Sequence, residues 1–158
     1  MVAMLRQVVL LVICANLVLC DPEHVTRKLC KDVDPSHCAV QTVEVDPCPL
    51  GPAFCVVKRN KKYAVTLDVT PHFSANNMKI SMNADVDNSD GYSTPLKSPG
   101  DACGLLYCPL EAEERQIFDV DLVLDKRASG KFPVKVKLWN ADNETQACCT
   151  TFNVKVNK

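Results

Sequence analysis

This chain of 158 residues lacks the excess of one charge sign that is typical of proteins with a highly charged partner. Lys and Arg number 18 against 19 Asp and Glu, and the net charge of −1 leaves no basic excess for a nucleic acid. Glycine occurs only five times, and none of the five belongs to a phosphate-binding glycine loop. The composition therefore favours neither nucleic-acid binding nor phosphate binding through such a loop.

The sequence also lacks a recognisable catalytic or metal-binding arrangement. Its three histidines fall in predicted loops or in the N-terminal arm, and none stands in a pattern with a Ser or Cys nucleophile. The pair His37-Cys38 is not joined by a second Cys-x-x-Cys or His pair of the kind that binds zinc. We therefore expect a protein that is not an enzyme and that uses no metal or cofactor.

Long apolar runs are missing beyond the N-terminus. Arg6 precedes a short apolar run over residues 8–15, and polar sequence begins at Asp21. This order predicts a secretory signal peptide over residues 1–20, because the run is too short for a membrane span. Cleavage is expected after Cys20, with Ala15 as the alternative, which leaves residues 21–158 as one secreted or lumenal domain.

Cysteine is abundant instead, with ten in the chain and eight after removal of the first 20 residues. An even number in a secreted protein favours four disulfides. Two short brackets, Cys48 to Cys55 and Cys103 to Cys108, are the clearest pairs, and Cys148-Cys149 lies near the C-terminus. The sequon that starts at Asn143 predicts an exposed loop and a glycosylation site.

Apolar and polar residues alternate with a period of two through most of the chain, and helical periodicity is nearly absent. A strand of this kind packs one face inward and exposes the other. Six or seven strands, separated by turns, predict an all-β fold, an immunoglobulin-like antiparallel β-sandwich of two sheets. The clearest strand segments cover residues 43–45, 63–69, 80–82, 118–124, 132–138 and 152–156.

The ordered fragments along the chain resemble the ML (lipid-recognition) domain, which includes Niemann–Pick type C2 proteins and group 2 mite allergens. The resemblance rests on 43–49 (VEVDPCP), 101–103 (DAC), 108–110 (CPL) and 132–136 (FPVKV), and it closes at Cys148. It implies a β-sandwich with an apolar cavity between the sheets, which binds single lipids. An alternating proline run of the family, before Cys103, is missing here.

The resemblance also implies how the cysteines pair. In the family a long-range bridge ties the N-terminal region to the last strand, which here gives Cys30–Cys148. The two additional cysteines, Cys38 and Cys149, then form a fourth bridge beside it. The swapped pairing, Cys30–Cys149 with Cys38–Cys148, stays open, since Cys148 and Cys149 point to opposite faces of one strand.

Residues that line the lipid pocket are assigned from the same resemblance and from the inward parity of the strands. The expected lining residues are Val45, Tyr63, Val65, Leu67, Tyr92, Leu96, Phe118, Val120, Leu124, Phe132, Pro133 and Val134. Phe132-Pro133 matches the aromatic-proline pair at the pocket mouth. Lys126, Arg127 and Lys131, in an inserted loop, are candidates to hold an acidic headgroup.

We therefore expect a secreted carrier of one sterol or fatty-acid-like ligand, with a lysosomal or other lumenal location as the alternative. Its expected partners are the lipid and a membrane or receptor protein for hand-off, and the protein is expected to be a monomer. Two other functions stay open: recognition of microbial lipids in innate immunity, and a β-sandwich interaction module without a cavity. The space between Tyr63, Leu124 and Phe132 distinguishes a carrier from a filled module.

Overall fold

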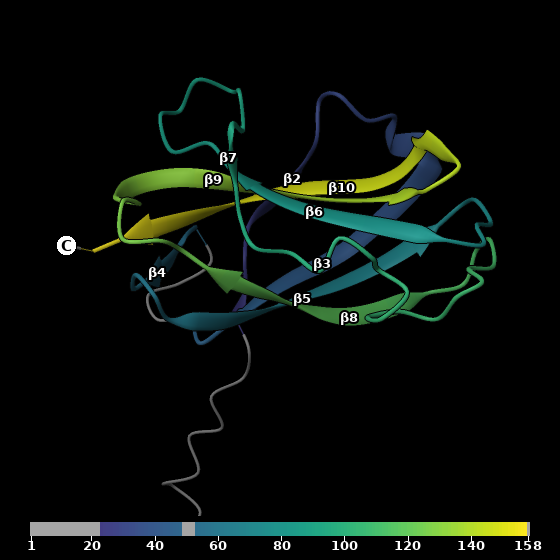
Figure 1. The fold of residues 1–158 in the computed structure, drawn as a ribbon, viewed down its shortest axis with the longest axis horizontal. Coiled ribbons are helices and arrows are strands. Elements are labelled where there is room, and N and C mark those ends of the chain that lie inside the picture. Colours follow the sequence, from purple (N-terminus) through teal and green to yellow (C-terminus); the bar gives the residue numbers. More distant parts are fainter. Residues whose placement is uncertain (1–22, 49–52, 158) are drawn as a thin grey trace, which may run out of the picture.

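The alternating segments fold into two β-sheets in the computed structural model, which describes residues 23–48 and 53–157. Figure 1 shows the two sheets packed face to face. A 3₁₀ turn, η1 (Pro35–His37), precedes β3. The strands are β1 (Glu23–His24), β2 (Arg27–Leu29), β3 (Cys38–Asp46), β4 (Cys55–Val57), β5 (Lys62–Pro71), β6 (Met78–Ala84), β7 (Thr94–Pro95), β8 (Gln116–Val123), β9 (Gly130–Asn140) and β10 (Asn143–Val156).

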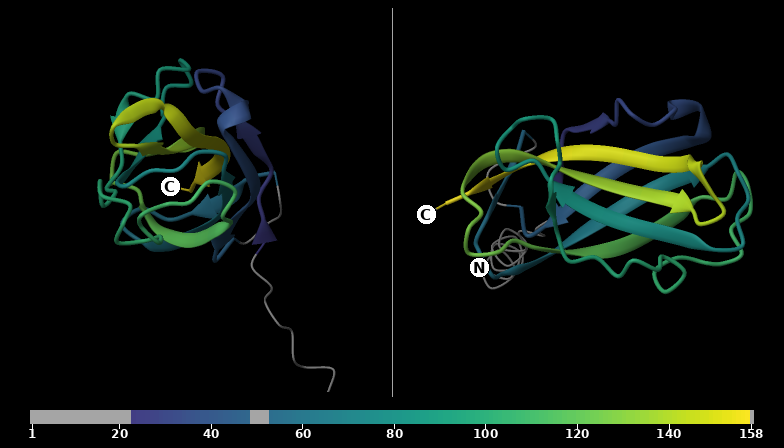
Figure 2. Two further views of the ribbon diagram at one scale, coloured as in Figure 1. Left: turned by 90° about the vertical axis from the view of Figure 1, so that its right-hand side faces the viewer. Right: turned by 45° about the horizontal axis from the view of Figure 1, so that its top comes forward.

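The sheets differ in size and share no strand. The smaller sheet has the order β1-β3-β5-β8, and the larger has the order β2-β10-β9-β6-β7, with β4 pairing in parallel with the end of β10. All other pairs are antiparallel. This confirms the predicted all-β sandwich, and Figure 2 shows the two layers from one end and in a view tilted forward.

Each long strand that the alternation predicted is present, and the short ones were missed. Strands β1, β2, β4 and β7 contain only two or three residues, too few for a periodic pattern to appear in the sequence. They lie at sheet edges or pair along part of β10. The predicted signal peptide falls within residues 1–22, outside the described residues, and it stays a prediction.

The core lies between the sheets and is built by the inward parity of the strands. Residues of β5 and β8 from the smaller sheet face residues of β6, β9 and β10 from the larger one. Val45, Val65 and Val134 expose none of their surface. Burying an aliphatic side chain of this size contributes about 1.5–3 kcal/mol each, so this layer supplies much of the stability.

Two disulfides close one side of the sandwich, and their pairing corrects the one that the family resemblance implied. Cys38 of β3 bonds to Cys148, and Cys30 bonds to Cys149. Cys148 shares the inward parity of Phe152 and reaches across to the smaller sheet, whereas Cys149 faces outward, where the chain passes after β2. The short brackets Cys48–Cys55 and Cys103–Cys108 are confirmed.

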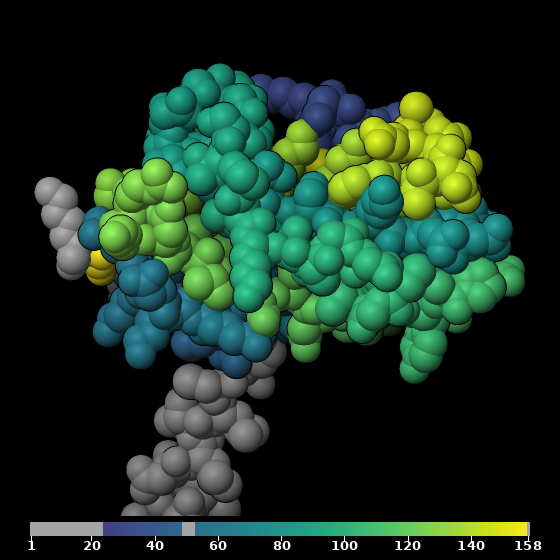
Figure 3. Space-filling view, in the orientation of Figure 1, coloured from purple at the N-terminus to yellow at the C-terminus, as the bar shows by residue number. Residues whose placement is uncertain are grey.

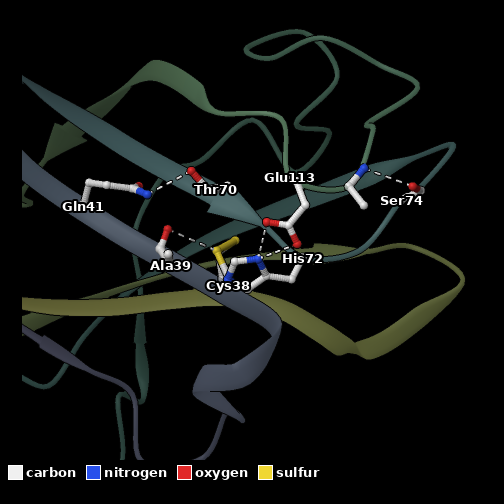
Figure 4. A network of polar contacts seen from close by, with 9 residues as sticks. Cys38, Ala39, Gln41, Thr70, His72, Ser74 and Glu113 are labelled. Atoms are coloured by element: carbon white, nitrogen blue, oxygen red, sulfur yellow. Dashed lines mark hydrogen bonds and ion pairs between the residues drawn. A yellow bond between two sulfur atoms is a disulfide. The ribbon is translucent and has the colours of Figure 1, made fainter.

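Polar contacts add to the Cys38–Cys148 disulfide at one end of the sandwich (Figure 4). The imidazole Nδ1 of His72 lies 2.8 Å from a carboxylate oxygen of Glu113. The backbone N–H of Ala112 donates to the hydroxyl of Ser74, so the segment before β8 is fixed to the end of β5. Farther along, the Gln41 amide and the Thr70 hydroxyl, 2.9 Å apart, link β3 to β5.

Candidate functional site

The candidate site lies on the side of the sandwich opposite the two long-range disulfides, Cys30–Cys149 and Cys38–Cys148. There β8 is the edge of the smaller sheet, while β6 and β7 form the edge of the larger one. Residues 101–110 cover one part of this side, where Leu110 exchanges two backbone hydrogen bonds with Ala75. Figure 3 shows this covering segment on the front of the molecule. The remaining part stays open, between residues 93–97 and 123–128.

That opening is a cleft of about 550 Å³ between the edges of the two sheets. Its apolar lining comes from Ala84, Val86 and Leu96 on the side of the larger sheet, and from Leu124 and Ala128 on the other. The N–H of Leu96 donates to the carbonyl of Met82 at 2.9 Å, which fixes the segment after β7 against β6. A cleft of this volume with an apolar lining is in the usual range for a small organic ligand.

The polar residues of the cleft lie at its surface. Lys97 and Arg127 both line the cleft and are exposed. The carboxylate of Asp125 accepts from the backbone N–H groups of Arg127 and Ala128, at 2.8 and 3.1 Å, and so shapes the turn at the mouth. The hydrogen bond from the backbone N–H of Arg127 is the main cause that lowers the pKa of Asp125 below its usual value of 3.8.

Most of the residues predicted to line a pocket lie together in the interior. Leu124 borders the cleft and is 2 % exposed, and Leu96 is half-buried in its wall. The other interior members are packed between the two sheets. They are Val45, Tyr63, Val65, Leu67, Phe118, Val120, Phe132 and Val134. Tyr63, Leu124 and Phe132 are buried in one continuous apolar cluster, so side chains fill the space between them and the opening lies at the cleft instead.

Tyr63 illustrates how an interior polar atom is satisfied. The ring is 7 % exposed, and its hydroxyl oxygen accepts a hydrogen bond of 2.8 Å from the backbone N–H of Lys58. Lys58 follows β4 directly, so this bond fixes the turn between β4 and β5. The apolar ring, rather than the hydroxyl, is therefore the part of Tyr63 that faces the interior.

Two predicted lining residues, Tyr92 and Pro133, lie elsewhere. Both border a second groove, of about 540 Å³, on the outer face of the larger sheet. Pro133 has the outward parity of β9, opposite to Phe132 and Val134. The ring of Tyr92 lies 5.3 Å from the Lys135 ammonium, and burial is the main cause that raises the pKa of its phenol above 10.0. The structure thus separates them from the interior set.

One wall of the outer groove is formed by the loop that includes residues 88–92. Asp85, 1 % exposed, accepts from the N–H groups of Ser89 and Asp90 at 3.0 and 2.9 Å. Asn88, Asp90 and Tyr92 all have positive φ angles, a backbone state that costs energy for residues other than glycine. The Asp-rich run at 85–90 was the available signal in the sequence, and nothing in it indicates a groove wall.

The cations proposed for an acidic ligand are divided in the same way. Arg127 lies at the cleft, whereas Lys131 lies on the outer face of β9, 4.5 Å from the centre of the Phe54 ring. Lys126 is exposed. Across residues 23–48 and 53–157, no group of three or more His, Cys, Asp or Glu side chains could hold a metal ion. The same residues include no helix with the length and apolarity to cross a membrane.

The fold is a two-sheet β-sandwich whose sheets leave an apolar cleft between their edges. A family model described as the ML domain matches residues 24–156, nearly the whole described chain. The protein belongs to the ML domain family, whose members bind lipids. The resemblance seen in the sequence is thereby confirmed.

Relatives and solved structures agree with this assignment. The chain is similar to the MD-2-related lipid-recognition protein of Manduca sexta, with 26% identity over 130 residues, which span 82% of this chain and 83% of the relative. It also resembles the crystal structure of a Niemann-Pick type C2 protein from Japanese carpenter ant, with a TM-score of 0.63 and 14% identity. That likeness covers 87% of this chain and 99% of the other, and it shows a common fold.

Proposed function

We propose that this protein is a secreted, non-enzymatic carrier that holds one fatty-acid-like lipid with its tail in the cleft between the two sheets. The observation that carries the proposal is the cleft itself, which is apolar inside and has Lys97 and Arg127 at its exposed rim. An apolar wall with a few polar groups at the mouth suits a ligand with a hydrocarbon tail and an acidic head. Four disulfides fit an extracellular or lumenal protein.

The interior behind the cleft sets how a long tail is accommodated. Phe132 and Val134 expose 1 % and 0 % of their surface, so at these positions the two layers are already filled. A longer tail therefore enters at the cleft and displaces interior side chains as it extends between the sheets. Burying about 400 Å² of hydrocarbon at about 25 cal/mol/Å² contributes on the order of 10 kcal/mol. Association entropy and side-chain ordering subtract several kcal/mol, which leaves about micromolar binding or tighter.

Substitution of Leu96 tests the site. Leu96→Asp places a charge in the apolar wall and should weaken binding of a fluorescent fatty acid at least about tenfold, because the carboxylate loses water when the tail enters. Ile117→Asp is the matched control, since Ile117 is 60% exposed on the outer face of β8. Equal affinities for the two variants, with both folded by circular dichroism, would place the lipid outside the cleft.

The headgroup is tested with two ligands of one chain length. The double variant K97Q/R127Q should bind a fatty acid less tightly than the parent protein does, and should bind the corresponding fatty alcohol as well as the parent protein does. The reason is that only the acid carries a charge for the two cations. If the acid and the alcohol respond alike, the rim cations do not select the headgroup.

A further inference from the structure

The charges of the strands are divided between the two sheets. Strands of the larger sheet carry seven basic residues and only Glu144 as an acidic one. Strands of the smaller sheet carry six acidic residues and only Lys62 as a basic one. The net charge near zero conceals this division, because the two sets cancel in the sum over the chain.

The lysines of the larger sheet gather on its outer face. Three of them, Lys131, Lys135 and Lys137, share the outward parity of β9, and Lys155 of β10 is the direct register partner of Lys131. Like charges placed directly opposite each other on neighbouring strands destabilise a sheet. We call this surface the basic face, and its lysines are Lys28, Lys79, Lys131, Lys135, Lys137 and Lys155.

Few carboxylates neutralise the basic face. Lys135 bonds to Asp32 at 2.6 Å, and within the described residues no other lysine of the face has a carboxylate within ion-pair distance. On the smaller sheet Lys62 is paired with Asp121, and Arg115, just before β8, is paired with Asp68. Asp32 and Asp90 border the outer groove on the same face, so the lysines that are available to an anionic surface are those outside the groove, above all Lys131, Lys137 and Lys155.

Aromatic rings lie under these lysines. Lys131 and Lys155 flank the ring of Phe54, with the ammonium nitrogens 4.5 and 5.8 Å from its centre. Lys137 lies 5.5 Å from the centre of the Trp139 ring, and Lys135 lies beside Tyr92. Rings with one apolar and one wet side, next to lysines, are typical of surfaces that meet the polar zone of a bilayer.

We infer that the basic face docks on a membrane that contains anionic lipids. The choice of a bilayer over another polyanion rests on the proposed lipid-carrying function. Geometry supports it, because one segment joins the basic face to the cleft: residues 88–92 border the outer groove, and residues 93–97 line the cleft. A protein docked through this face holds the cleft mouth beside the bilayer, where a single lipid enters or leaves.

Vesicle binding tests this inference. The triple variant K131Q/K137Q/K155Q removes three lysines without an ion-pair partner. At low salt it should bind phosphatidylcholine vesicles containing phosphatidylserine about 100-fold less tightly than the parent protein, as expected from the contribution of each lysine near such a surface. The charge-matched control K58Q/K61Q/K62Q, in the turn between β4 and β5 and at the first residue of β5, should bind nearly as the parent protein does. Vesicles of phosphatidylcholine alone should bind neither protein.

Several results would overturn the inference. Equal loss of binding in both triple variants would show that net charge rather than this face is responsible. A parent protein that binds heparin or an acidic protein but not anionic vesicles would assign the face to another polyanion. Uptake of a fluorescent fatty acid added without vesicles distinguishes a failure of the docking proposal from a failure of the carrier proposal. K131Q/K137Q/K155Q should retain that uptake, and a parent protein without any uptake would refute the carrier function whatever the vesicles show.

Discussion

At the scale of single residues, the hydroxyl of Tyr63 is used by the fold and leaves only its ring to a ligand. We expect Tyr63→Phe to lower the free energy of unfolding by about 1–2 kcal/mol, because the N–H of Lys58 loses its acceptor. The affinity for a fatty acid should stay within about twofold of the parent value. Urea unfolding and a fluorescence titration measure the two quantities, and unchanged stability with lost affinity would reverse this assignment.

The residue scale is also where sequence reasoning reaches its limit. Strand parity alone placed Phe132 and Val134 inside, and they are buried. The same parity indicates that Pro133 faces outward. It was expected in the pocket only because Phe132-Pro133 matches the aromatic-proline pair of the family. Tyr92 lies in a loop with positive φ angles, where no periodicity tells which way a side chain points.

At the scale of elements, Asp32 joins the segment after β2 to the middle of β9. Its hydrogen bond with Lys135 is the main cause that lowers the pKa of Asp32 below 3.8. A carboxyl group with a lowered folded-state pKa stabilises the protein above the unfolded-state pKa, and loses this contribution as the pH falls through the folded-state pKa. The carboxylate is 62% exposed, so we expect only about 0.5 kcal/mol at neutral pH.

Urea unfolding of the parent protein and of D32N at several pH values measures this link. The difference in unfolding free energy should be constant near neutral pH and should disappear as the pH falls below about 4. In the K135M background, the D32N substitution should change the unfolding free energy much less at every pH, because Asp32 has already lost its main partner. A difference that grows toward acid pH would contradict the assignment.

The elements also show what a pattern in the sequence can and cannot provide. Period-two alternation located the six long strands, because each buries one face along much of its length. It could not locate β7, whose two residues help to place Leu96 at the cleft. Parity also indicates that Cys148 and Cys149 face opposite sides of β10, but it does not decide the disulfide pairing. Only the course of the chain after β2 decides which cysteine each one meets.

At the scale of the whole molecule, the sandwich is closed on one side and open on the other. Disulfides tie β3 and the end of β2 to β10, while the cleft lies between β7 and the end of β8. The basic face adjoins the cleft through residues 88–97. The sequence predicted the two layers, but the position of the opening depends on where residues 93–97 and 101–110 cross the edge, which no local pattern encodes.

Nuclear magnetic resonance with a ¹³C-labelled fatty acid tests most directly whether the space between the sheets holds the lipid. We expect nuclear Overhauser contacts from the tail to the methyl groups of Leu96 and Leu124, and with a long tail also to those of Val134. Contacts to Leu29 and the ring of Tyr92 alone would place the lipid in the outer groove instead. That result, or the absence of any contact with a folded protein at saturating lipid, would contradict the account.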